Sequence, residues 1–84
     1  MSMSAIAQRI AEIMVDKFEV PAQKVDVNAE FETMELDSLV LVELAVMLQK
    51  QYGVAVDDWE IEEAKTIENT AALLLAKGAK PVAA

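Results

Sequence analysis

Apolar residues recur at helical spacing near the N-terminus and again after residue 38, and this pattern constrains the fold more than any other feature of the chain. In the first segment, from about Ser4 to Phe18, large apolar residues follow one another at intervals that place them on one face of a helix. They are Ile6, Ile10, Ile13, Met14 and Phe18. We expect Ser4 to be the N-cap of this helix and Pro21 to prevent its extension.

A second helix is predicted from Ser38 to Tyr52, with Gly53 as the residue that ends it. Its expected core stripe consists of Leu41, Leu44, Ala45, Leu48 and Tyr52. The opposite face carries an apolar outer strip with a charged edge. The outer strip consists of Leu39, Val42 and Val46, and the edge consists of Glu43 and Lys50. Two interpretations stay open: another element covers the outer strip, or the strip is an interaction surface.

Between these helices, residues 20–37 lack periodicity. Val25, Val27, Phe31 and Met34 are scattered among polar residues. We interpret this segment as a long connection whose apolar residues pack back into the core. So long a loop is uncommon in a small domain, which suggests that it crosses the length of the domain.

The rest of the chain predicts two further helices. Residues 57–63 hold five acids in seven positions and could form a short helix with Trp59 or Ile61 turned inward. Thr66 is the expected N-cap of a last helix, which runs to Lys77 and ends at Gly78. The sequence therefore predicts an all-α fold, a four-helix bundle with a long first loop and a short third helix. We expect one domain over residues 1–84, with its core over about 4–77 and a flexible tail over 78–84.

The charge balance favours some partners and disfavours others. Fifteen acidic residues against seven basic ones give a formal net charge of −8. This charge repels phosphate backbones, so we expect no nucleic-acid partner, and it favours proteins with basic patches. An acidic surface that only keeps the protein soluble explains the same balance.

Residue types that the chain lacks exclude most catalytic chemistry. It contains no Cys and no His, so it has no thiol nucleophile, no disulfide and no imidazole base or ligand. The acidic stretch from Asp57 has Trp59 and Glu62 where an EF-hand requires an acid and a Gly, so we expect no metal site of that kind. We expect a protein that is not an enzyme. No apolar run approaches roughly 20 residues, and the N-terminus lacks signal-peptide features, so we expect a cytoplasmic protein without a membrane partner.

The stretch Leu36-Asp37-Ser38-Leu39 lies where the long connection meets the second helix. Asp and Ser at this point are also what an ordinary helix start requires. A serine in the first turn is nevertheless exposed, and the helix amides and dipole favour a phosphate there. These residues alone indicate a modified or recognised serine.

The sequence resembles the acyl and peptidyl carrier protein family over nearly its whole length. Phe31 precedes Asp37-Ser38-Leu39, which is followed by Val42-Glu43-Leu44, Tyr52-Gly53 and Thr66-Ile67. The resemblance implies that a phosphopantetheinyl transferase moves 4′-phosphopantetheine from coenzyme A onto Ser38. The thiol of this arm then forms the thioesters, a role that a Cys side chain could have had in a chain that contains one.

The resemblance implies a discrete acyl carrier protein for fatty acid, polyketide or related biosynthesis, expected to be a monomer. Its partners would be the transferase and acyl transferases, condensing enzymes and tailoring enzymes. Because the outer strip lies next to the arm, we expect these partners to dock on Leu39, Glu43 and Val46, with Asp37 at the rim. One alternative is a stand-alone peptidyl or aminoacyl carrier, although Glu35-Leu36 stands where such carriers commonly have Gly-Gly. The other is an unmodified helical interaction module whose outer strip binds a partner helix.

Overall fold

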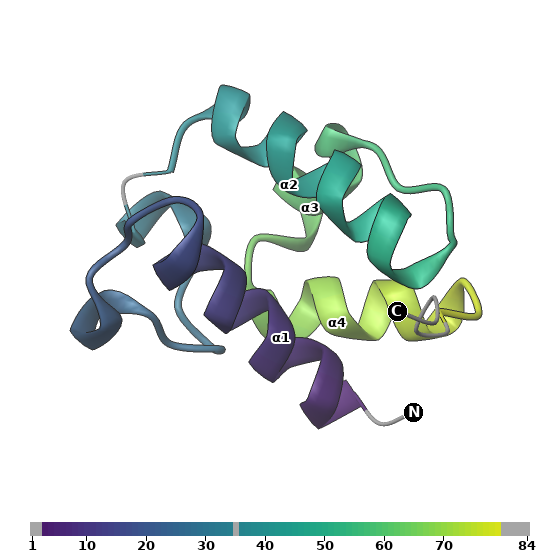
Figure 1. Cartoon of the computed structure of the whole chain (residues 1–84), viewed down its shortest axis with the longest axis horizontal. Helices are drawn as coiled ribbons and strands as arrows, with labels where there is room; N and C mark the ends of the chain where they lie inside the picture. The colour runs from purple at the N-terminus through teal and green to yellow at the C-terminus, as the bar shows by residue number, and fades with distance from the viewer. Residues whose placement is uncertain (1–2, 35, 80–84) are drawn as a thin grey trace.

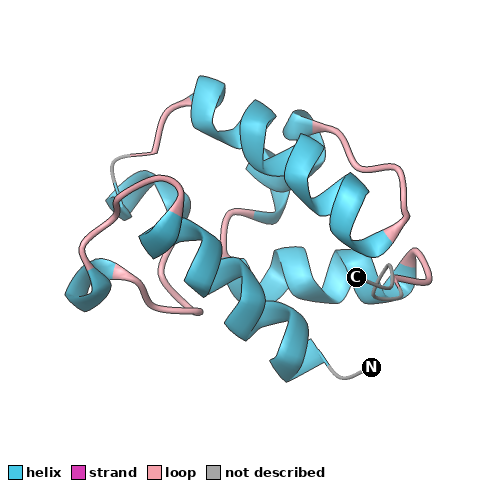
Figure 2. Ribbon diagram, viewed as in Figure 1, coloured by secondary structure: helices cyan, strands magenta, loops and turns pink. Residues whose placement is uncertain are grey.

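Four α-helices and two short 3-10 helices make up the fold. The computed structural model describes residues 3–34 and 36–79. The elements are α1 (Met3–Asp16), η1 (Ala22–Lys24), η2 (Phe31–Met34), α2 (Ser38–Tyr52), α3 (Asp58–Ala64) and α4 (Ile67–Ala76). Figures 1 and 2 show α1 and α4 crossing below α2, with α3 behind α2. The predicted all-α fold with a short third helix is confirmed, and within the described ranges the one β pairing is an isolated bridge between Glu30 and Thr66.

Helix α1 buries the face that its periodicity predicts. Its buried residues are Ile6, Ala7, Ile10, Ile13 and Met14. The N-cap prediction at Ser4 is wrong, because the helix already includes Met3, whose side chain packs against the core. Helix α1 ends at Asp16, and Phe18 packs beyond it, half-buried. Glu19 has a positive φ of 57°, which turns the chain before Pro21 is reached.

The ends of α2 and α4 are set by residues that the sequence identifies. The Val40 N–H donates to the Asp37 carboxylate at 3.0 Å, which makes Asp37 the N-cap of α2, and Gly53 ends that helix with a φ of 67°. The Asn69 N–H donates to Thr66 Oγ1 at 3.0 Å at the start of α4. All five predicted core residues of α2 are buried, namely Leu41, Leu44, Ala45, Leu48 and Tyr52.

The long connection packs against the bundle, as predicted. Phe31 and Met34 are buried, and Val25 and Val27 are half-buried against the core. Two backbone hydrogen bonds tie the connection to the region where α3 passes into α4. The Phe31 N–H donates to the Lys65 carbonyl at 2.7 Å, and the Glu68 N–H donates to the Val27 carbonyl at 2.8 Å.

The C-terminal segment continues the core beyond α4. Gly78 has a φ of 86°, and the Ala79 N–H donates to the Leu74 carbonyl at 3.0 Å, which leaves Ala79 buried. The expectation of a flexible tail over 78–84 otherwise falls on residues 80–84, which lie outside the described residues.

Lys65, the C-cap of α3, has a φ of 70°, a conformation that residues with a Cβ rarely adopt. Lys65→Gly removes this strain, and part of the gain is offset because glycine is more flexible in the unfolded chain. We expect the free energy of unfolding to rise by about 0.5–1 kcal/mol, measured by urea denaturation. Lys65→Ala, which removes the charge but keeps the Cβ, is the control and should give no gain. Equal stability of the two variants would contradict this explanation.

Candidate functional site

Ser38 is the first residue of α2, and its side chain is exposed. Asp37 supplies the capping carboxylate, so the Ser38 hydroxyl is not needed to start the helix. Leu36 is half-buried, and its N–H donates to the Phe31 carbonyl at 3.4 Å, which holds the connection just before the serine. The structure therefore presents one hydroxyl at the positive end of a 15-residue helix.

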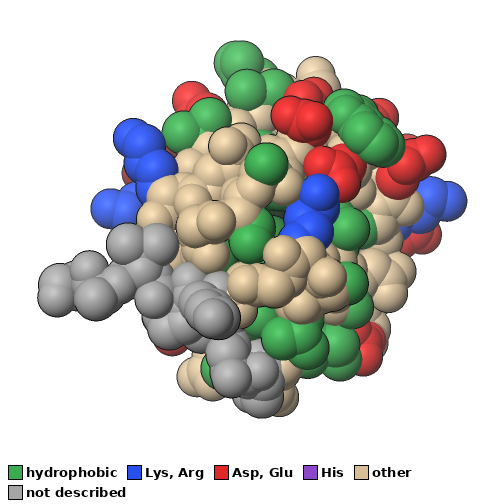
Figure 3. Space-filling view, turned by 90° about the vertical axis from the view of Figure 1, so that its right-hand side faces the viewer, with side chains coloured by type: hydrophobic (Ala, Val, Ile, Leu, Met, Phe, Trp, Pro, Cys, Tyr) green, Lys and Arg blue, Asp and Glu red, His purple; other side chains and the backbone are tan. Residues whose placement is uncertain are grey.

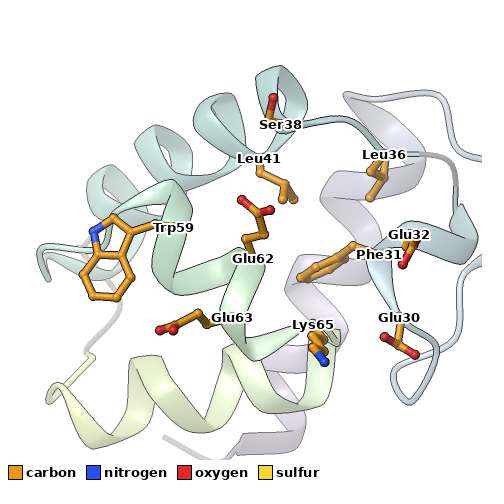
Figure 4. Close-up of a pocket in the computed structure, with 10 residues that line it drawn as sticks. All are labelled: Glu30, Phe31, Glu32, Leu36, Ser38, Leu41, Trp59, Glu62, Glu63 and Lys65. Carbon is orange, nitrogen blue, oxygen red and sulfur yellow. The ribbon is translucent and has the colours of Figure 1, made fainter.

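An open groove of about 680 Å³ begins at Ser38 and runs between the connection, α2 and α3. Its apolar lining consists of Phe31, Leu36, Leu41 and Trp59, and its charged lining consists of Glu30, Glu32, Glu62, Glu63 and Lys65. Figure 4 shows Ser38 at the α2 edge of the groove, and Glu62 directed from α3 toward Leu41. The groove is lined by residues that precede α2, belong to α2 and follow α2 in the sequence. The sequence alone did not indicate this groove.

The outer strip of α2 is exposed. Leu39 is 68% exposed, and Val42 and Val46 are also exposed. Glu43, at the edge of the strip, is exposed as well. Among residues 3–34 and 36–79, no element covers the strip, so the first of the two interpretations is wrong for this part of the chain. The face shown in Figure 3 has apolar side chains next to acidic ones.

Helix α3 forms one wall of the groove, and Ile61 anchors it. Ile61 is 0% exposed, whereas Trp59 is 57% exposed, so it is Ile61 that turns inward. The Glu60 carboxylate accepts a hydrogen bond from the Asp57 N–H at 3.1 Å and forms an ion pair with Lys77 Nζ at 2.9 Å. The hydrogen bond from Lys77 has the largest effect and lowers the pKa of Glu60, and the hydrogen bond from the Asp57 N–H lowers it further. Glu60 is therefore ionised near neutral pH.

The described residues offer neither a metal site nor a membrane span. Within the described ranges, no three Asp or Glu side chains come together in a way that could hold a metal ion. None of the described helices has the length and apolar character required to cross a membrane.

Comparison with known proteins agrees with this geometry. The family model described as "Phosphopantetheine attachment site" matches residues 8–74. The chain belongs to the phosphopantetheine-binding carrier family. Its prosthetic group is 4′-phosphopantetheine, and it is a carrier protein, not a catalyst. An exposed hydroxyl at a helix N-terminus, open to a groove, fits this group.

Three relatives are called acyl carrier protein. The chain is 35% identical to that of Petrotoga mobilis over 78 residues, which cover 92% of each chain. It is 36% identical to that of Thermosynechococcus vestitus over 70 residues, or 82% of this chain and 86% of the relative. It is 39% identical to that of Rubrobacter xylanophilus over 69 residues, or 81% and 85%. These similarities confirm the family resemblance and the cofactor predicted from the sequence.

Proposed function

We propose that this protein is a discrete acyl carrier protein that holds acyl groups as thioesters on a 4′-phosphopantetheine arm at Ser38. It would present them to enzymes of fatty acid, polyketide or related biosynthesis. The observation that carries the proposal is the exposed Ser38 hydroxyl at the first residue of α2, within Leu36-Asp37-Ser38-Leu39 and beside an open groove. The relatives named acyl carrier protein support an acyl cargo.

Attachment of the arm requires little of the chain beyond its serine. Ser38 Oγ attacks the phosphorus atom of coenzyme A that bears the pantetheine moiety. A new O–P bond forms, the pyrophosphate P–O bond breaks, and adenosine 3′,5′-bisphosphate leaves. A base takes the hydroxyl proton, and the chain has no His for that role. The dipole of α2 then stabilises the phosphodiester anion by about 0.3–1 kcal/mol, opposed in part by the Asp37 carboxylate.

Intact-mass measurement after incubation with coenzyme A and a broad-specificity phosphopantetheinyl transferase tests the proposal directly. One added phosphopantetheine per chain is expected. A chain that gains no mass would instead be an unmodified interaction module. A peptidyl or aminoacyl carrier would gain the arm but accept amino-acid cargo, so loading assays with acyl and aminoacyl donors separate the remaining alternatives.

We also propose that partner enzymes dock on Asp37, Leu39, Glu43 and Val46. All four side chains are exposed, and they lie on or beside the outer strip next to Ser38. Acyl transferases, condensing enzymes and tailoring enzymes with basic surfaces fit this combination of apolar contact and negative charge. Charges at the rim of such an interface act mainly on the rate of association.

Glu43→Lys is expected to lower kcat/KM for loading of the phosphopantetheinylated protein by about 3- to 10-fold at low salt, because it places a cation opposite a basic partner surface. A malonyl transferase from fatty acid synthesis serves as the probe, and loading is followed by mass. The difference should shrink as ionic strength rises, since salt screens exposed charges. Asp16→Lys makes the same charge change on another helix, α1, and is the control. Equal losses in both variants would contradict docking at Glu43.

A further inference from the structure

Trp59 is an exposed tryptophan whose position the fold does not explain. It is the one Trp of the chain, and 57% of it is exposed although large aromatic side chains usually bury most of their surface. Ile61 already provides the inward contact of α3. Figure 4 shows the indole projecting from α3 at the opposite end of the groove lining from Phe31 and Leu36.

Helix α3 is held at both ends, so the backbone that carries the indole has a fixed position. At its start, Glu60 joins the Asp57 N–H to Lys77 on the far side of α3. At its end, the Lys65 N–H donates to the Ile61 carbonyl at 3.1 Å, and the Lys65 carbonyl accepts from the Phe31 N–H. A rigid aromatic side chain loses little entropy when a partner covers it, which is a property of residues that dominate binding energy.

The surroundings of Trp59 are negative. Asp58 precedes it, and Glu62 and Glu63 follow at three and four residues, which places them on the same side of α3. In the part of the chain that the structure describes, none of these three carboxylates has an ion pair. Lys65 is the one cation that lines the groove. A partner surface that is complementary to Trp59 and these acids has an apolar pocket surrounded by Lys and Arg side chains.

The phosphopantetheinyl transferase is the partner that must cover this region. An enzyme that acts on the cargo docks on the outer strip and reacts at the thiol end of the arm, whereas the transferase must bring the Ser38 hydroxyl itself to the phosphorus atom of coenzyme A. Ser38 and Trp59 line the same groove, so an enzyme surface seated over Ser38 also meets α3. Basic side chains that bind the phosphates of coenzyme A suit the acids beside Trp59 as well.

We propose that Trp59 is the hydrophobic anchor that the phosphopantetheinyl transferase buries while Ser38 reacts. This inference rests on the proposed attachment at Ser38 and extends the contact surface beyond the outer strip, from α2 to α3. Trp59 acts in binding and takes no part in the chemistry, so its loss should appear in KM and leave kcat nearly unchanged.

The test is modification of the apo-protein by a broad-specificity transferase, with coenzyme A saturating. Trp59→Ala is expected to lower kcat/KM by at least about 10-fold, mainly through KM, and Trp59→Phe should recover part of the loss. Leu75→Ala, which truncates an exposed apolar residue of α4 outside the groove, should behave as wild type. Circular dichroism checks that each variant is folded. An unchanged KM in folded Trp59→Ala overturns the inference.

A second measurement does not depend on truncating the side chain. The unreactive Ser38→Ala chain carries 5-fluorotryptophan at its one Trp, and its ¹⁹F resonance is followed as transferase is added. A shifted resonance on binding supports the anchor, and an unmoved resonance in the complex overturns it. The same label in the chain that keeps Ser38 gives the remaining comparison: if its resonance moves when the arm is attached, with no enzyme present, and KM does not depend on Trp59, the residue contacts the arm and the inference is wrong. Failure of wild type to gain the arm would refute the proposed function, whereas normal modification with a KM independent of Trp59 refutes this inference alone.

Discussion

Ser38→Ala is expected to abolish attachment of phosphopantetheine, the largest functional effect that any single substitution in this chain should have. Alanine offers no oxygen to attack coenzyme A. The other serines, Ser2 and Ser4, lie near the N-terminus of the sequence, and Ser4 is within α1. Intact mass after incubation with the transferase should show one added phosphopantetheine for wild type and none for the variant.

The same variant should keep its fold, because Asp37 and not Ser38 caps α2. We expect its free energy of unfolding to lie within about 0.5 kcal/mol of wild type, as for most exposed positions away from special structural features. Ser4→Ala, at an exposed serine of α1, is the matched control and should be modified at the wild-type rate. An arm found on Ser38→Ala, or its loss from Ser4→Ala, would show that the attachment site is assigned to the wrong residue.

The sequence was most informative where periodicity is long. Helix α2 spans 15 residues, about four turns, so its core stripe could be assigned to five residues, all of which are buried. The turn chemistry at its two ends was equally clear, because Gly53 adopts the positive φ that a helix stop requires. The packing of Phe31 and Met34 could be predicted because apolar residues in an otherwise polar connection stabilise the folded state only when they are buried.

Short elements and tertiary contacts were harder to predict. Helix α3 has seven residues, too few for the spacing of its apolar residues to decide between Trp59 and Ile61. Nothing local signals that Glu60 pairs with Lys77, 17 positions further along the chain. The groove depends on three separate segments, so the role of α3 as its wall could not be derived from residues 57–63 alone.

The candidate site shows the same division. Ser38, the residue that we propose carries the arm, could be proposed from the sequence because a serine after Asp37 at a helix start is visible as a local motif. The surface around it is not local. The sequence signal for the proposed contact between α3 and the transferase was an acidic run that contains one Trp. That signal can be interpreted only once it is known that Ile61 turns inward and leaves Trp59 exposed.

Ile61→Ala should have a large effect on stability, because Ile61 holds α3 against the core. Ile61 is 0% exposed and is the one buried residue of α3. Truncating a buried Ile to Ala lowers the free energy of unfolding by about 2–5 kcal/mol. The whole free energy of unfolding of a small domain is about 5–15 kcal/mol, so this loss is a large part of it. Thermal denaturation should show a fall in Tm of at least about 8 °C, given 4–8 °C per kcal/mol for a domain of this size.

The loss of helical structure in Ile61→Ala should be concentrated in α3, because a seven-residue helix is not stable without tertiary contacts. Amide hydrogen exchange is expected to accelerate first within residues 58–64, while α1 stays protected, and modification of Ser38 should slow as the wall of the groove and Trp59 lose their fixed positions. Ile61→Val, which removes one methylene and costs about 0.5–1.5 kcal/mol, is the control and should leave α3 folded. If Ile61→Ala destabilised all helices equally and modification stayed at the wild-type rate, α3 would contribute to the fold but not to recognition of the serine.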